Sequence, residues 1–146
     1  MKPEQEAYVR LLHAADAMQR DMEKLLKPYE LSPPQFNALR ILRGAGPDGL
    51  PSGQVAERMI TRDPDVTRLL DRLETRGLIE RGRREEDRRV VVARIAGPGL
   101  ALLKRLDAPV FRRHVRQFAA LTPAELDSLT GLLARLCDRK RGSRIN

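Results

Sequence analysis

The fold is decided by residues 63–95, which read DPDVTRLLDRLETRGLIERGRREEDRRVVVARI. In the first half of this stretch, apolar residues recur at steps of three and four, which places them on one face of an α-helix: Val66, Leu69, Leu70 and Leu73. Asp63 followed by Pro64 is typical of a helix N-terminus, and Gly77 is suited to the backbone conformation that ends many helices. We therefore predict a helix over residues 63–76 with Asp63 as its cap.

The second half of the stretch is typical of a β-hairpin. Residues 78–83 and 89–95 have the composition of strands, and the second contains three consecutive valines at positions 90–92. A charged turn lies between them at residues 84–88. The sequence thus predicts two antiparallel strands within residues 78–95, with a polar tip, directly after the helix.

A shorter helical segment precedes this stretch. Ser52 can cap a helix that carries Val55, Ala56 and Met59, and only a few residues separate it from the helix at 63–76. Two helices joined in this way, the second with an exposed threonine- and arginine-rich face, form a helix-turn-helix. Because a hairpin follows at once, we predict a winged helix-turn-helix within residues 32–96.

Two helices are expected before this pair. Residues 4–27 carry an apolar repeat at helical spacing, and Pro28 ends it. A second helix is expected up to about residue 43, because Ser32 and Gln35 form a capping-box pattern at its start. Glycines and a proline break the pattern after that point.

Two helices are also expected after the hairpin. A leucine-rich stripe begins after residues 97–99 and continues past Pro109, and a last helix begins with the capping box of Thr122 and Glu125. The fold class predicted for the whole chain is therefore mainly α with a small β-hairpin, an α+β arrangement.

The terminal helices carry wider apolar stripes than the central region can cover. A second copy of the chain is the simplest cover, because two-fold dimers are the commonest assemblies. We predict a homodimer in which residues 1–31 and 97–146 are dimerisation helices of one intertwined unit around residues 32–96. Such a dimer would hold two copies of the helix at 63–76 at a fixed separation.

The charge of the chain is basic and dominated by arginine. The 146 residues hold 28 Lys+Arg against 20 Asp+Glu, a net charge of +8. Residues 58–94 contain eleven arginines, eight acidic residues and no lysine. Arginine makes planar, bidentate contacts, and the low aromatic content of 3% argues against single-stranded RNA, which is recognised by stacking. With the helix-turn-helix, this composition favours double-stranded DNA as the partner.

Other classes of protein find little support in the sequence. The longest uncharged runs, at residues 31–39 and 95–103, are nine residues each, against about 18 for a membrane span. The first residues turn acidic at once and lack the apolar core of a secretory signal, so a cytoplasmic protein is expected. One cysteine and two histidines are too few for a zinc site, and no set of catalytic residues stands out. We expect no metal, no cofactor and no enzymatic activity.

Three segments together resemble the MarR family of bacterial transcription regulators. They are residues 65–74 (DVTRLLDRLE), residues 77–81 (GLIER), and Asp87-Arg88-Arg89 leading into residues 90–95. The resemblance covers nearly the whole chain in helix order, length and the position of the hairpin. It implies a homodimeric winged-helix regulator, here interpreted as a repressor, that binds a near-palindromic operator. It also implies release by a small aromatic or phenolic ligand in the manner of many family members.

The resemblance and the helical pattern together give the candidate DNA-binding residues. On the helix, Thr67 and Arg68 fall where the family reads bases, and Arg62 and Arg72 flank that face and suit phosphate contacts. Asp65 has two interpretations, either accepting a hydrogen bond from cytosine N4 or only capping the helix. Thr67, Arg68 and Asp71 lie opposite the apolar face of the helix, and the competing interpretation of these three is an ordinary solvated helix face.

The hairpin supplies a second set of candidates. Asp87 and Arg89 fall on the family's Asp-x-Arg motif, in which the acid positions an arginine that enters the minor groove. Further arginines lie around the turn: Arg83, Arg84 and Arg88. A solvated charge run is the alternative, but the neighbouring acidic residues fit better with one or two held arginines in a narrow groove.

The family implies a ligand pocket between the dimer helices and the DNA-binding region. Four residues are candidates for its lining: His13, Met18, Phe36 and Arg40. Ordinary core and surface positions explain the same residues. Cys137 is expected to be a half-buried apolar filler rather than a redox sensor. The alternative function for the whole chain is a winged helix without an effector, used for sequence-indifferent DNA binding or for protein contact.

Overall fold

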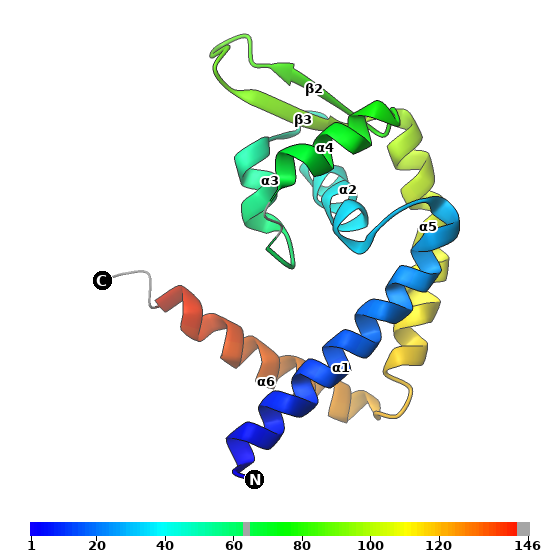
Figure 1. Cartoon of the computed structure of the whole chain (residues 1–146), viewed down its shortest axis with the longest axis vertical. Helices are drawn as coiled ribbons and strands as arrows, with labels where there is room; N and C mark the ends of the chain where they lie inside the picture. The colour runs from blue at the N-terminus through cyan, green and yellow to red at the C-terminus, as the bar shows by residue number, and fades with distance from the viewer. Residues whose placement is uncertain (63–64, 143–146) are drawn as a thin grey trace. The chain divides into compact units, whose positions relative to one another are not determined.

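Helices make up most of the computed structural model, which describes residues 1–62 and 65–142 and contains two units, Met1–Val110 and Phe111–Asn146 (Figure 1). Its elements are, in chain order, α1 (Pro3–Leu26), the 3-10 turn η1 (Lys27–Tyr29), α2 (Pro33–Ala45), β1 (Leu50–Pro51), α3 (Ser52–Arg58), α4 (Val66–Thr75), β2 (Ile79–Arg83), β3 (Val91–Ile95), α5 (Gly97–Gln117) and α6 (Pro123–Gly142). The predicted mainly helical fold with a hairpin after the helix-turn-helix is confirmed.

The sheet has three antiparallel strands in the order β1-β3-β2, one more than the sequence predicts. β2 and β3 pair from Ile79 with Ile95 to Arg83 with Val91, so the paired part of the hairpin begins two residues later on its second strand than predicted. β1 has only two residues and pairs with β3 through Leu50 and Ala93. So short a strand, half of it proline, leaves no periodic signal in the sequence.

Gly49 lets β1 approach β3. Its φ of +66° lies in the left-handed region that glycine tolerates, and a Cβ atom at this position would lie 2.2 Å from the carbonyl oxygen of Ala93. Arg94 adds a polar tie across the same place, because its Nε donates to the carbonyl of Pro47 at 3.1 Å. The loop that precedes β1 is thereby held against the hairpin.

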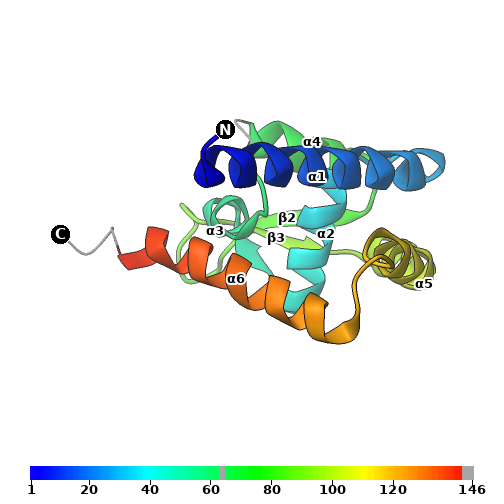
Figure 2. The ribbon, with the colours of Figure 1, turned by 90° about the horizontal axis from the view of Figure 1, so that it is seen from below.

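The core of the first unit lies between α2, α4 and the sheet. α2 packs on β3 and on α4, and α4 packs in turn on β2 (Figure 2). The leucines of this core are fully or almost fully buried, among them Leu39, Leu42, Leu70 and Leu73. Leu103 and Leu106 of α5 join the same cluster. Burial of each such side chain contributes about 1.5–3 kcal/mol, so this core fixes the position of α4.

Two predicted helix starts differ from the observed ones. Pro51 is the cap residue of α3 and Ser52 already lies within the helix, so the prediction of Ser52 as a side-chain cap is wrong. α4 begins at Val66, and its cap is Asp65, whose carboxylate accepts from the backbone N–H of Arg68 at 2.9 Å. The predicted cap Asp63 lies outside the described residues.

Two other predicted helix starts are confirmed, whereas α5 begins at Gly97 and so includes the residues 97–99 that the sequence places before the helix. Ser32 and Gln35 form a reciprocal capping box at the start of α2. Thr122 and Glu125 form the same arrangement before α6, with distances of 2.8 and 3.2 Å. These boxes are local, because each satisfies two backbone N–H groups within four residues, and this is why the sequence alone predicts them.

Large apolar side chains remain exposed on both units. On the first unit most of them lie on α1, namely Tyr8, Val9, Leu11 and Leu12, while Ile60 and Leu100 are exposed outside that helix. On the second unit they lie on the end of α5 and on α6: Phe111, Val115, Leu126, Leu132 and Leu136. Within the described residues, no helix combines the length and apolar character that a membrane crossing requires.

Candidate nucleic-acid interface

α4 presents one buried face and one exposed face. Leu69, Leu70 and Leu73 are buried against the core, as the spacing predicts. Thr67, Arg68 and Arg72 are exposed on the opposite side. The side chain of Arg68 is 70% exposed, and among the described residues it faces Asp65, whose carboxylate lies 3.8 Å from Nε. Among the described residues, α4 therefore offers a free polar face of the kind that enters a DNA major groove.

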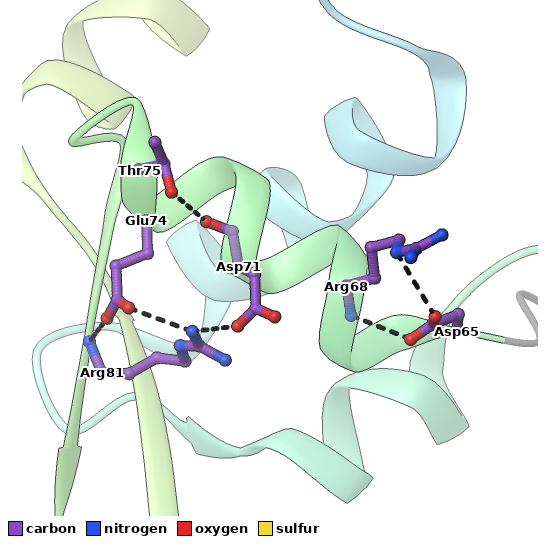
Figure 3. Close-up of polar contacts among 6 residues, drawn as sticks. All are labelled: Asp65, Arg68, Asp71, Glu74, Thr75 and Arg81. Atoms are coloured by element: carbon purple, nitrogen blue, oxygen red, sulfur yellow. Dashed lines mark hydrogen bonds and ion pairs between the residues drawn. The ribbon is translucent and has the colours of Figure 1, made fainter.

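Asp65 is held in place at the first turn of α4. One of its oxygens accepts from the backbone N–H of Arg68, and the other faces the Arg68 side chain (Figure 3). Of the two interpretations left open by the sequence, capping is thus present in the structure. A carboxylate so placed also interacts favourably with the positive end of the helix dipole. Arg62, four residues before α4, is exposed.

The hairpin formed by β2, β3 and their connection, residues 79–95, is called the wing below. At its tip, one oxygen of Asp87 accepts from the backbone N–H of Arg89 at 3.1 Å and from its Nε at 3.2 Å. The Arg89 side chain is nevertheless 92% exposed. The turn thus presents a guanidinium to solvent while an adjacent carboxylate restrains its orientation.

The other wing arginines differ in what they do. Arg83 donates from Nη1 to the carbonyl of Arg88 at 2.7 Å, so its side chain closes the turn. Arg84 and Arg88 are exposed, and no polar contact of their side chains is found among the described residues. Of the five predicted wing residues, Arg84, Arg88 and Arg89 are therefore open to a partner, whereas Arg83 and Asp87 shape the turn.

A polar cluster joins α4 to the wing (Figure 3). Arg81 of β2 donates from Nη2 to Asp71 Oδ1 and, at 3.0 Å, to Glu74 Oε1. The backbone N–H of Arg81 donates to the other oxygen of Glu74, also at 3.0 Å. The hydrogen bond from Arg81 lowers the pKa of Glu74, and the bond to Glu74 raises the pKa of Arg81 above its already high value. Glu74 and Arg81 therefore both stay charged at neutral pH.

A basic hollow lies beside the exposed face of α4. It measures about 390 Å³ and is lined by residues of α4, of the turn after η1 and of α2: Glu30, Gln35, Arg68, Asp71, Arg72, Thr75 and Arg76. Arg76 is engaged, since its guanidinium donates to the carbonyls of Glu30 and Tyr29 and ties the end of α4 to that turn. Arg72 lines the hollow and is exposed, in keeping with the predicted phosphate contact.

The predicted ligand-binding residues lie on two helices. His13 is exposed on α1 and lines an open hollow with charged neighbours of the same helix. Met18 of α1 is half-buried, and Phe36 belongs to the core. Arg40 is exposed and lies over the Phe36 ring, 5.7 Å from its centroid. The structure thus brings Phe36 and Arg40 together on α2.

Cys137 does not occupy the half-buried position expected of it. It lies exposed on α6. The apolar repeat of α6 does not bury it, because two leucines of that repeat, Leu132 and Leu136, are themselves 55% and 59% exposed. Among the described residues, no cluster of three or more groups suited to a metal ion is present.

The sequence pattern alone does not identify Arg81, Glu74 and Arg76 as parts of this interface. Asp71 and Glu74 are spaced i, i+3, so they lie on neighbouring parts of the helix surface, and Arg81 follows seven residues later. That spacing is the only signal available, because the contact depends on how β2 turns back beside α4 after Gly77. Gly77 has a φ of +72°, which makes this reversal possible.

Comparison with known proteins gives consistent matches over the region just described. The sequence profile of the MarR family matches residues 31–91. The transcriptional regulator PecS of Dickeya dadantii is 32% identical over 119 residues, which span 80% of this chain and 69% of PecS. A crystal structure of a MarR transcription factor from Planctomyces limnophilus is 42% identical with a TM-score of 0.73, covering 92% of this chain and 97% of that one.

More distant solved structures share the fold. A mutant MarR from E. coli, complexed with operator DNA, has a TM-score of 0.80 at 24% identity and covers 91% of this chain and 95% of its own. BpsR of Bordetella bronchiseptica, whose DNA binding is regulated by 6-hydroxynicotinic acid, has a TM-score of 0.84 at 22% identity. The match covers 94% of this chain and 97% of BpsR. The described fold therefore extends over nearly the full length of these proteins.

Proposed function

Because the chain belongs to the MarR family of transcription regulators, which are not enzymes, we propose that it is a homodimeric repressor of a near-palindromic DNA operator. In this proposal α4 enters the major groove and the wing reaches the adjacent minor groove. One observation carries it: α4 and the wing each present a largely free arginine, Arg68 and Arg89, beside an aspartate that restrains it. The structure of E. coli MarR complexed with operator DNA, which shares this fold, supports DNA as the partner.

The two arginines are assigned different roles. Arg68 on α4 would donate to base edges, where a bidentate arginine contact discriminates against the wrong base by about 1–3 kcal/mol. Arg89 would enter the minor groove, whose negative potential is strongest where the groove is narrow. Arg62, Arg72, Arg84 and Arg88 would contact phosphates, which position the protein without reading sequence.

The role of Arg68 can be tested on a selected operator. Double-stranded oligonucleotides are selected from a random library with the wild-type protein, and the enriched duplex and a scrambled duplex are titrated with wild type and Arg68→Ala. We expect the variant to lose roughly 5- to 150-fold in affinity for the enriched duplex and to lose most of the preference over the scrambled one.

Arg10→Ala is the matched control for this experiment. Arg10 is a surface arginine of α1 that pairs with Glu6 at 2.8 Å, so its loss removes the same charge away from α4. An Arg68→Ala protein that keeps the wild-type ratio of affinities would remove Arg68 from base reading.

A dimer is supported by the exposed apolar side chains of the terminal helices. α1 exposes Leu11 and Leu12 at 45% and 49%, and α6 exposes Leu132 and Leu136 at more than half. Exposed apolar groups in such number are typical of surfaces that another chain covers. Sedimentation equilibrium at micromolar concentration should give twice the chain mass of 16.5 kDa. A single chain at that concentration would contradict the proposal.

An effector is the remaining part of the proposal. Arg40, exposed over the ring of Phe36, offers a guanidinium to a carboxylate, and His13 and Met18 of α1 are the further residues that this proposal assigns to the site. The regulation of BpsR by 6-hydroxynicotinic acid supports a small aromatic acid as the ligand class. Addition of 6-hydroxynicotinate or benzoate should release operator DNA from wild type and not from Arg40→Ala. Unchanged DNA affinity at millimolar concentrations of both acids would leave the regulator without an effector of this class.

A further inference from the structure

Arg81 makes more polar contacts between α4 and the wing than any other described residue does. Its guanidinium meets two carboxylates of α4 that lie one turn apart, Asp71 and Glu74. Its side chain is only 18% exposed, against 70% for Arg68 and 92% for Arg89. Arg81 is therefore too enclosed to act as the arginine that meets DNA, although it lies on the same surface.

Glu74 completes the connection by satisfying the edge of the sheet. β2 is an edge strand, because the strand order is β1-β3-β2 and only β3 pairs with it. A backbone N–H on the free side of an edge strand needs a partner other than a neighbouring strand. Glu74 provides it, since one of its oxygens accepts from the backbone N–H of Arg81 while the other accepts from its side chain.

Because of the position of Arg81 along β2, its contacts with Asp71 and Glu74 can restrain the orientation of the wing. The base of the wing is fixed by Leu78 and Ile79, which are 6% and 1% exposed. Beyond these residues, the next ties from β2 to α4 are the contacts of Arg81, halfway to the tip. Two residues further on, Arg83 closes the turn onto the carbonyl of Arg88. A chain of contacts thus runs from α4 through Arg81 and β2 to the tip that carries Arg89.

We propose that Arg81 is a positioning residue that holds the wing at a fixed angle to α4, so that Arg68 and Arg89 reach one stretch of duplex DNA together. This inference rests on the proposed function for its DNA consequence. The restraint that Arg81 places on the wing through its contacts with α4 does not depend on DNA. The two parts can therefore be tested separately.

The DNA consequence is measured as a double-mutant cycle between Arg81 and Arg89. Residues that act through one linked element show interaction energies of about 0.5–3 kcal/mol, which corresponds to roughly 2- to 150-fold in affinity. In the wild-type background Arg89→Ala removes a well-placed contact. In the Arg81→Met background the wing is no longer held, so Arg89→Ala should cost at least about fivefold less. Additive losses would overturn the proposal.

A matched control separates positioning from general destabilisation. Arg43 of α2 forms an ion pair with Asp107 of α5 at 3.0 Å and is, like Arg81, only partly exposed, at 33%. Among the described residues its side chain hydrogen-bonds to Asp107 and makes no polar contact with the wing. Arg43→Met should therefore leave the cost of Arg89→Ala unchanged. If Arg81→Met does not fold, Glu74→Gln is used instead, because it keeps the contact between Arg81 and Asp71. Glu74→Gln should then show an interaction energy with Arg89→Ala of the same sign and smaller size.

The mechanical link is measured without DNA by amide hydrogen exchange. Arg81→Met should speed exchange of the amides of residues 81–91 relative to those of α2, whereas Arg43→Met should leave this ratio at the wild-type value. Faster wing exchange in a protein that selects no DNA sequence would keep the link and refute the proposed function. Wing exchange unchanged by Arg81→Met and Glu74→Gln would overturn the link itself.

Discussion

Replacing Asp65 with alanine removes the side chain that caps α4. In the structure this carboxylate accepts the backbone N–H of Arg68 at 2.9 Å, and its second oxygen lies 3.8 Å from the Arg68 side chain. The sequence leaves it open whether Asp65 caps the helix or accepts a hydrogen bond from cytosine. Alanine and asparagine distinguish these roles, because asparagine caps a helix about as well as aspartate does.

The size of the effect follows from the two contacts. The cap serves one backbone N–H at an exposed site, where water replaces part of the lost bond, and such caps contribute about 1 kcal/mol. The 3.8 Å contact joins side chains that are 70% and 56% exposed, so it adds little. Asp65→Ala should therefore lower the free energy of unfolding by about 1 kcal/mol, or the melting temperature by roughly 2–4 °C. Asp65→Asn should cost a few tenths of that, through weaker interaction with the helix dipole.

Thermal unfolding and operator titration are measured on the same three proteins. A capping role requires Asp65→Asn to keep the base preference of wild type and to lose only a few tenths of a kcal/mol of stability, whereas Asp65→Ala loses about 1 kcal/mol. A switch of preference from cytosine to adenine at one operator position in Asp65→Asn would show that the side chain reads a base. Equal stability of the alanine variant and the wild type would refute the capping argument.

Three further predictions follow from other parts of the structure. Gly49→Ala should lower the free energy of unfolding, measured by denaturant titration, by more than about 1 kcal/mol, because the new Cβ would lie 2.2 Å from the Ala93 carbonyl oxygen. Gly44→Ala is the control: its Cβ would enter open space within α2, so the same titration should show a neutral or stabilising effect. Because Arg81 lowers the pKa of Glu74 below its ordinary value of 4.5, Glu74 contributes stability that is present above that pH and is lost as the pH falls through the lowered pKa. Urea titrations should therefore show that the difference in unfolding free energy between wild type and Glu74→Gln becomes smaller on acidification. A difference that does not change with pH would contradict this assignment. Arg89→Ala should weaken operator binding and flatten the dependence on A·T steps flanking the site, as measured by titrating duplexes with A·T and G·C flanks; an undiminished preference would make Arg89 structural.

The parts of the fold that the sequence predicts are those encoded by neighbouring residues. The boxes at Ser32 and Thr122 are complete within four residues, and the buried face of α4 follows from the spacing of its leucines. The three consecutive valines and the charged turn predict the wing. Each of these features needs no knowledge of what lies elsewhere in the chain.

The parts that the sequence does not predict depend on contacts between distant segments. β1 exists because Gly49 allows Leu50 to pair with Ala93, more than forty residues away. Arg76 is held by the carbonyls of Tyr29 and Glu30, which lie 47 and 46 residues earlier in the chain. The exposure of Cys137 likewise depends on packing that the repeat of α6 does not specify.

The candidate site shows the same division. Thr67, Arg68 and Arg89 were located from periodicity and from the Asp-x-Arg pattern, and they are exposed as expected. The division of the wing arginines into free and engaged groups was not predictable, because it depends on which carbonyls and carboxylates the folded turn brings within reach. Arg81 is the clearest example, since its role depends on two acids of a different element.

The central claim is that α4 and the wing read a specific duplex. Its most direct test is a fluorescence-anisotropy titration of the selected duplex and of a scrambled duplex of equal length and composition, over a series of salt concentrations. We predict a preference of about a thousandfold or more for the selected duplex near physiological salt. Equal affinity for both duplexes, falling in parallel as salt rises, would mean that the arginines bind phosphate alone and would contradict the account.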